Sequence, residues 1–147
     1  MKNKYIIIFS TALIIILLDQ ITKFLIKINF KLNESLSIIK NIFHLTYTHN
    51  FGAGFGILQN QQWILIFISI IVIGVIFYYF DRIKDKETLL QIIVGFILGG
   101  TIGNLIDRIS YGFVIDFLDF RIWPVFNLAD SFVTIGVAGL IIYLWKK

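Results

Sequence analysis

Long apolar runs, separated by short polar connections, dominate the pattern of this chain. Four of the runs are long enough to cross a hydrocarbon layer of about 30 Å as helices. They cover residues of about 5–26, 63–80, 88–106 and 125–145. The pattern therefore predicts a single integral membrane domain over residues 1–147, with four transmembrane helices and longer loops at about 27–62 and 107–124.

The first of these loops contains a pattern with a shorter period. From Ile42 to His49, apolar and polar residues alternate, and three alternate glycines follow at Gly52, Gly54 and Gly56. A period of two is typical of a β-strand with one packed face and one wet face, and the glycines indicate tight turns or close backbone approach. We therefore expect an all-α membrane protein that carries a small extracytoplasmic β-sheet on the outer membrane surface.

Composition supports the membrane class and excludes several others. Hydrophobic residues make up 58% of the chain and charged residues 15%, with a mean hydropathy of +0.86, whereas soluble domains have about 45–50% apolar and about 25% charged residues. The absence of cysteine excludes disulfides, thiol nucleophiles and iron–sulfur clusters. The two histidines, His44 and His49, lie on opposite faces of the predicted strand without a third ligand nearby, so we expect no metal and no other cofactor.

The distribution of positive residues predicts how the chain is oriented. Segments 1–4, 81–87 and 146–147 hold seven Lys or Arg in thirteen residues, whereas the two longer loops hold five in fifty-four. This bias places both termini in the cytoplasm. The first run follows two lysines, as a signal peptide would, but no A-x-A-like cleavage site follows it, so we expect a retained helix. The lysines and arginines form no basic stripe, which argues against nucleic acid as a partner.

Polar side chains gather at one predicted depth, near the outer ends of the first, third and fourth runs. They are Asp19, Lys23, Asn104, Asp107, Arg108, Asp116, Asn127 and Asp130. Ionisable groups at such positions are costly and are functional candidates by default.

Several of these residues also have structural explanations. Asp19 and Lys23 are four residues apart on a helix and can form a simple ion pair. Arg108, with Asp107 as a possible counter-ion, can extend to lipid headgroups. Asn127 is suited to cap the start of the fourth helix.

Asp130 is harder to explain structurally, because no Lys or Arg lies within one helical turn of it in the fourth run. Asp116 precedes it by fourteen residues, and a loop that turns at Pro124 can bring the two together. Two carboxylates held close in a low-dielectric site share one proton, and such a pair is the working unit of aspartic proteases. Asp119, which lies in the same loop, is expected to be a solvated charge.

At this point the chain resembles the lipoprotein signal peptidases, also called signal peptidase II. The resemblance covers nearly the whole length and rests on five motifs in the family's order. They are Asp19-Gln20-Ile21-Thr22-Lys23, Asn50-Phe51-Gly52-Ala53-Gly54-Phe55, Gly99-Gly100-Thr101-Ile102-Gly103-Asn104-Leu105-Ile106-Asp107-Arg108, Val114-Ile115-Asp116-Phe117 and Phe126-Asn127-Leu128-Ala129-Asp130. Two departures are Gly54, where Ala or Ser is more usual, and a shorter stretch between Asp116 and Asp130.

The resemblance implies an aspartic endopeptidase of the bacterial inner membrane, with its active site near the outer face. The sequence does not define the oligomeric state, and we expect a monomer. Its substrates would be prolipoproteins that carry a diacylglyceryl group, cut just before the lipidated cysteine, and membrane lipids would be its other partners. Asp116 and Asp130 would be the catalytic pair, without assignment of the base. The implied substrate-positioning and supporting residues are Asp19, Lys23, Asn50, Gly52, Asn104, Asp107, Arg108 and Asn127.

Two further expectations concern the substrate and the alternative function. The edge of the predicted strand at 43–49, with the glycines that follow, would accept an extended substrate segment. The alternative is a small proton- or cation-coupled transporter that uses Asp130 as a relay. Such a path needs polar groups through the whole depth, whereas the inner halves of the runs are almost wholly apolar.

Overall fold

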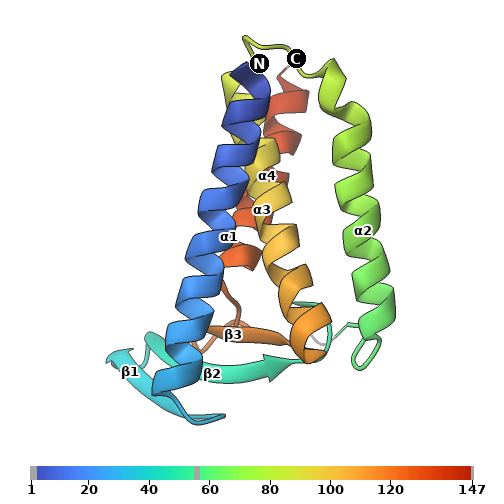
Figure 1. The fold of residues 1–147 in the computed structure, drawn as a ribbon. Helices are drawn as coiled ribbons and strands as arrows, with labels where there is room; N and C mark the ends of the chain where they lie inside the picture. The colour runs from blue at the N-terminus through green and yellow to red at the C-terminus, as the bar shows by residue number, and fades with distance from the viewer. Residues whose placement is uncertain (1–2, 55–56, 147) are drawn as a thin grey trace.

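Four helices long and apolar enough to cross a membrane form the body of the computed structural model, in which residues 3–54 and 57–146 are described. The helices, with a short 3-10 turn after the second, are α1 (Asn3–Asn29), α2 (Gln62–Tyr79), η2 (Phe80–Arg82), α3 (Thr88–Tyr111) and α4 (Leu128–Trp145). The start of α1 and the end of α4 lie together at one end of the bundle, and a small sheet closes the other end (Figure 1). The chain is therefore a multi-pass membrane protein with a sheet end and a terminal end.

Two helix boundaries differ from the predicted spans in ways that affect the site. Helix α3 continues to Tyr111, where Gly112 ends it in a left-handed conformation with φ of 76°. Asp107 and Arg108 therefore lie on a helix and not in a loop. Helix α4 begins only at Leu128, because Asn127 caps it with its side chain, so the predicted start near residue 125 is wrong.

The sheet has three antiparallel strands in the order β1-β2-β3, where β1 is Ser35–Ile39, β2 is Phe43–Asn50 and β3 is Val114–Asp119. Strand β2 confirms the predicted strand, but β1 and β3 pair with both of its edges. The expectation that β2 offers an open edge to the substrate is therefore wrong for residues 43–46, where β1 covers the edge opposite β3; the pairing of β1 does not extend to residues 48–50. Strand β3 was expected to be loop; nearly all of its residues are buried, which removes the alternation by which half-buried strands are recognised.

Small residues on α3 let the helices approach closely. A Cβ atom at Gly99 would lie 2.8 Å from the carbonyl oxygen of Ala12 in α1, and one at Gly100 would lie 2.5 Å from that of Ala129 in α4. Small residues at helix contacts are the usual means by which transmembrane helices pack. Helices α1, α3 and α4 thus form a tight group, and α2 stands to one side of it (Figure 1).

The substitution Gly99→Ala should destabilise the protein by about 1–3 kcal/mol, because the added methyl group has no space between α1 and α3. The matched control is Gly74→Ala in the middle of α2, where a Cβ would meet nothing within 4 Å. That change should leave the unfolding midpoint unchanged or raise it, since alanine favours a helix over glycine by about 1 kcal/mol. Thermal unfolding in detergent compares the two variants, and equal midpoints would contradict the packing argument.

Candidate active site

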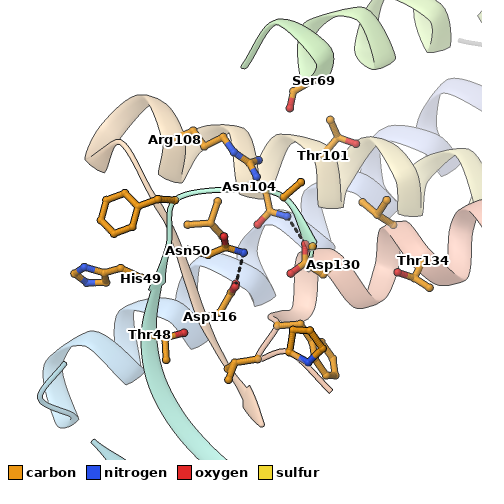
Figure 2. A pocket seen from close by; sticks show the side chains of 18 of the residues that line it. Thr48, His49, Asn50, Ser69, Thr101, Asn104, Arg108, Asp116, Asp130 and Thr134 are labelled. Atoms are coloured by element: carbon orange, nitrogen blue, oxygen red, sulfur yellow. Dashed lines mark hydrogen bonds between the residues drawn. The ribbon is translucent and has the colours of Figure 1, made fainter. Parts of the chain in front are cut away.

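Asp116 and Asp130 reach the same cavity from different elements. Asp116 lies on β3 and Asp130 lies in the first turn of α4, and both line a cavity of about 610 Å³ at the sheet end. Figure 2 shows the two carboxyl groups beside each other, with Asn50 of β2 and Asn104 of α3 next to them. The fold thus brings together the two carboxylates that the sequence analysis paired.

The start of α4 holds Asp130 in a capping box. The side-chain oxygen of Asn127 accepts a hydrogen bond from the backbone N–H of Asp130 at 2.9 Å, and the Asp130 carboxylate accepts one from the backbone N–H of Asn127 at 3.3 Å. The predicted N-cap is confirmed. Asp130 is the third residue of the helix, where the backbone N–H groups and the helix dipole favour a negative charge.

Two asparagines hold the carboxyl group of Asp116. Asn127 donates to Oδ1 at 2.7 Å and Asn50 donates to Oδ2 at 2.9 Å. Burial raises the pKa of Asp116, the nearby charge of Asp130 raises it further, and the two asparagine hydrogen bonds act in the opposite direction. This balance favours one proton shared between the two carboxyl groups.

Asn104 connects the pair to a buried cation. Its amide nitrogen donates to Asp130 at 2.8 Å, and its amide oxygen accepts from Lys23 at 3.0 Å and from Asn127 at 3.1 Å. Because a lysine ammonium can only donate, the contact with Lys23 fixes which way the amide of Asn104 points. Its nitrogen is thereby directed at the carboxyl group of Asp130.

Lys23 forms the centre of a buried ion cluster with Asp19 and Asp107. The ammonium lies 2.8 Å from Asp19 and 2.9 Å from Asp107, and all three side chains are at most 2% exposed. The predicted pair of Asp19 with Lys23 is confirmed, and α3 supplies the second carboxylate.

The two acids of this cluster also hold the elements that carry the catalytic candidates. Asp19 accepts from the backbone N–H of Ala129 in α4 at 3.0 Å, and Asp107 accepts from that of Ile115 in β3 at 3.1 Å. A Cβ at Gly103 would lie 2.6 Å from the Asp19 carboxylate, so only glycine permits this approach. The cluster therefore fixes β3 and α4 relative to α1.

Arg108 turns toward the protein, which differs from the alternative in which it reaches lipid headgroups. It donates to the carbonyl oxygen of Gly52 at 3.3 Å and lines the cavity, and its Nε is buried without a partner among the described residues. Gly52 in turn donates its N–H to the side chain of Asn50 at 2.9 Å. Phe55 and Gly56, which belong to the second motif and to the glycine series, lie outside the described residues.

The sequence analysis missed one supporting residue and misjudged another. Gln20 donates to Asp107 at 3.0 Å and to the backbone of Gly103 at 3.2 Å; its place inside the first motif is the only sequence signal for this role. Asp119 is not a solvated charge, because it is 5% exposed and accepts a hydrogen bond from Thr46 at 2.7 Å. Its carboxylate also forms an ion pair with Arg121 at 3.0 Å.

The histidines and carboxylates near the cavity are separated from one another or already bonded. Among the described residues, no group of three or more His, Cys, Asp or Glu side chains could hold a metal ion. His49 stacks on Phe113 with a centroid distance of 3.7 Å, and His44 lies 3.2 Å from the hydroxyl of Ser35. The groups best placed for acid–base chemistry in the cavity are therefore the two carboxyl groups, which Asn50, Asn104 and Asn127 hold by hydrogen bonds.

Comparison with known proteins agrees with this geometry. The family model described as signal peptidase (SPase) II matches residues 11–146. The chain belongs to this family. A lipoprotein signal peptidase of Halothermothrix orenii is 49% identical over 95% of this chain and 96% of its own length, and one of Moorella thermoacetica is 44% identical over 92% and 88%. A solved bacterial membrane enzyme is 34% identical, with a TM-score of 0.85 over 94% of this chain and 92% of its own.

These similarities confirm the family resemblance that the five motifs indicated. They also identify the chain as a protease of the signal peptidase II type. None of the relatives reported above is a transporter.

Proposed function

We propose that this protein is an aspartic endopeptidase that removes the signal peptide from diacylglyceryl-modified prolipoproteins, cutting just before the lipidated cysteine. Asp116 and Asp130 are the proposed catalytic pair. The observation that carries the proposal is the pair of buried carboxyl groups facing one cavity, each held by asparagine donors.

In the proposed reaction, the ionised carboxyl group takes a proton from a water molecule, and the water oxygen attacks the scissile carbonyl carbon. The protonated carboxyl group donates its proton to the carbonyl oxygen as the tetrahedral intermediate forms. The carbon–nitrogen bond then breaks: the carboxyl group that took the proton from water passes it to the leaving amine of the cysteine, and the other carboxylate takes back a proton from a hydroxyl of the intermediate. Either aspartate can serve as the base, because both have asparagine donors that stabilise the ionised form.

The remaining site residues have proposed roles that follow from their contacts. Asn104 and Asn127 orient the two carboxyl groups, and Asp19, Lys23 and Asp107 hold the elements that carry them. Asn50 accepts a hydrogen bond from Gly52, and the carbonyl oxygen of Gly52 holds Arg108 at the cavity wall, where its guanidinium can bind the substrate backbone.

Dependence on the lipid tests this function. Purified protein should release the signal peptide from a lipidated precursor, because the acyl chains hold the cleavage site at the depth of the two carboxylates. It should cut an unlipidated precursor poorly or not at all, and a chelator should leave the activity intact. Signal-peptide release is followed by gel mobility or mass spectrometry. Equal turnover of lipidated and unlipidated precursors would contradict the proposed substrate class.

We also propose that the protein lies in the bacterial inner membrane with both termini in the cytoplasm, which puts the sheet end and the active site near the outer face. The seven positive residues in the thirteen predicted inner positions support this orientation. A reporter that is active only outside the cytoplasm should work when fused after Asn60. It should fail when fused after Lys84 or Lys147, and activity after Lys84 would reverse the orientation.

A further inference from the structure

The cavity continues past the two aspartates toward the terminal end of the bundle. Helices α2, α3 and α4 line this extension with three hydroxyl side chains, Ser69, Thr101 and Thr134, among apolar neighbours such as Val72 and Val133. Figure 2 shows Thr101 and Thr134 on the far side of Asp130 from the sheet. The extension is thus a mostly apolar part of the cavity that carries three hydroxyl groups.

The hydroxyl groups of Thr101 and Thr134 are available to a ligand. Threonine in a helix commonly bonds a carbonyl of its own helix, as Thr22 does with the carbonyl oxygen of Leu18 at 2.8 Å. The side-chain hydroxyls of Thr101 and Thr134 make no hydrogen bond within the described part of the chain. Ser69 donates to the carbonyl oxygen of Leu65 at 2.9 Å, which leaves its oxygen free to accept a further hydrogen bond.

A protease that cuts at membrane depth needs hydrogen-bonding groups of this kind. The scissile bond of a signal helix becomes accessible only when the helix unwinds, which frees backbone N–H and C=O groups. Each such group costs several kcal/mol in hydrocarbon if it stays unpaired. The enzyme must therefore supply partners near the cut.

The position of the two threonines along their helices determines which substrate residues they can contact. Thr134 follows Asp130 by four residues, so it lies about 6 Å from this aspartate along the axis of α4, and Thr101 lies about 4.5 Å along α3 from Asn104, which donates to Asp130. An extended chain rises about 3.3 Å per residue, so this distance corresponds to about two residues. The signal segment enters from the terminal end, so these are residues on the amino-terminal side of the scissile bond.

We propose that Thr101 and Thr134, with Ser69 as an additional acceptor, form a substrate subsite that binds the unwound signal-peptide backbone about two residues before the scissile bond. This inference rests on the proposed function and orientation. In this subsite the three hydroxyl groups form hydrogen bonds with substrate backbone groups that lost their partners when the signal helix unwound.

The test combines enzyme variants with substrates that lack single backbone donors. Thr101→Val and Thr134→Val preserve side-chain shape and remove the hydroxyl group, so each should lower kcat/KM for a synthetic diacylglyceryl lipopeptide by about three- to tenfold. Thr101→Ser and Thr134→Ser should restore most of the activity. The matched control is Thr11→Val in α1, which contacts Gly95 and does not line the cavity.

The substrate series replaces one amide by an ester at the first, second or third residue before the cut. An ester at the second residue should lower kcat/KM of the unaltered enzyme by a similar factor. It should have little further effect on one of the two variants, Thr101→Val or Thr134→Val, because the hydroxyl that accepts this N–H is already absent there, and its effect should be additive with the other variant. Purely structural threonines would give additive effects with every ester.

Three outcomes separate the possibilities. Non-additivity confined to one ester position supports the subsite. Full additivity, or threonine variants that match Thr11→Val, would overturn it while the proposed function stands. Failure of the unaltered enzyme to cut the all-amide lipopeptide would overturn the proposed function itself.

Discussion

Asp116→Asn and Asp130→Asn are each expected to lower kcat/KM for a lipidated prolipoprotein by at least the factor of about 10²–10⁴ that is typical of general acid–base groups. In the proposed mechanism the two carboxyl groups share one proton and act on one water, so either substitution removes the same step. The double variant should therefore cost little more than the worse single variant. Signal-peptide release is measured with equal amounts of folded, purified protein.

The matched control for these variants is Asp85→Asn. Asp85 is exposed in the connection between η2 and α3, far from the cavity, and its replacement should leave activity close to that of the unaltered protein. Asp119 is unsuitable as a control because it is buried and bonded to β2. A folded Asp130→Asn protein that retains a large fraction of the activity would rule out the aspartic mechanism.

The four membrane helices could be predicted from the sequence because each must satisfy its backbone hydrogen bonds within itself in lipid. Their ends were harder to predict. Hydropathy indicates which residues contact lipid, whereas a helix continues as long as its backbone hydrogen bonds continue. Helix α3 therefore runs past the apolar stretch through Asp107 and Arg108 as far as Tyr111. These two residues face the protein, where Asp107 pairs with Lys23 and Arg108 donates to the carbonyl oxygen of Gly52.

The residues that form the site could also be predicted, but the contacts between them could not. A charged or amide side chain inside an apolar run is costly, so positions such as Asp19, Asn104 and Asp130 stand out without a structure. Which group meets which depends on contacts between distant segments. Asp19 caps the helix that carries Asp130, although Ala129, which donates the hydrogen bond, is 110 residues later.

The errors at the sheet have the same physical origin. The sequence from 114 to 119 lacks an exposed face, so no alternation distinguished a strand from a loop there. Once β3 pairs with β2, Asp119 meets Thr46, which lies 73 residues earlier in the chain. The same pairing covers one edge of β2, and β1 covers the other edge over residues 43–46.

Lys23→Met is expected to destabilise the protein by about 3–5 kcal/mol, the usual cost of removing one partner from a buried ion pair. The ammonium is 2% exposed and holds two carboxylates at 2.8 and 2.9 Å. Without it, Asp19 and Asp107 would face each other across a buried space with no cation between them. Unfolding in detergent, followed by circular dichroism, measures the loss.

The control for this substitution is Lys31→Met, which removes an exposed lysine just beyond α1 and should change stability by less than about 0.5 kcal/mol. Adding Asp107→Asn to Lys23→Met should recover part of the lost stability, because it neutralises one of the two carboxylates left without a cation. If Lys23→Met unfolds at the same midpoint as Lys31→Met, the ion cluster does not hold β3 and α4 in place. The fixed geometry of the catalytic pair would then have to come from the asparagine network alone.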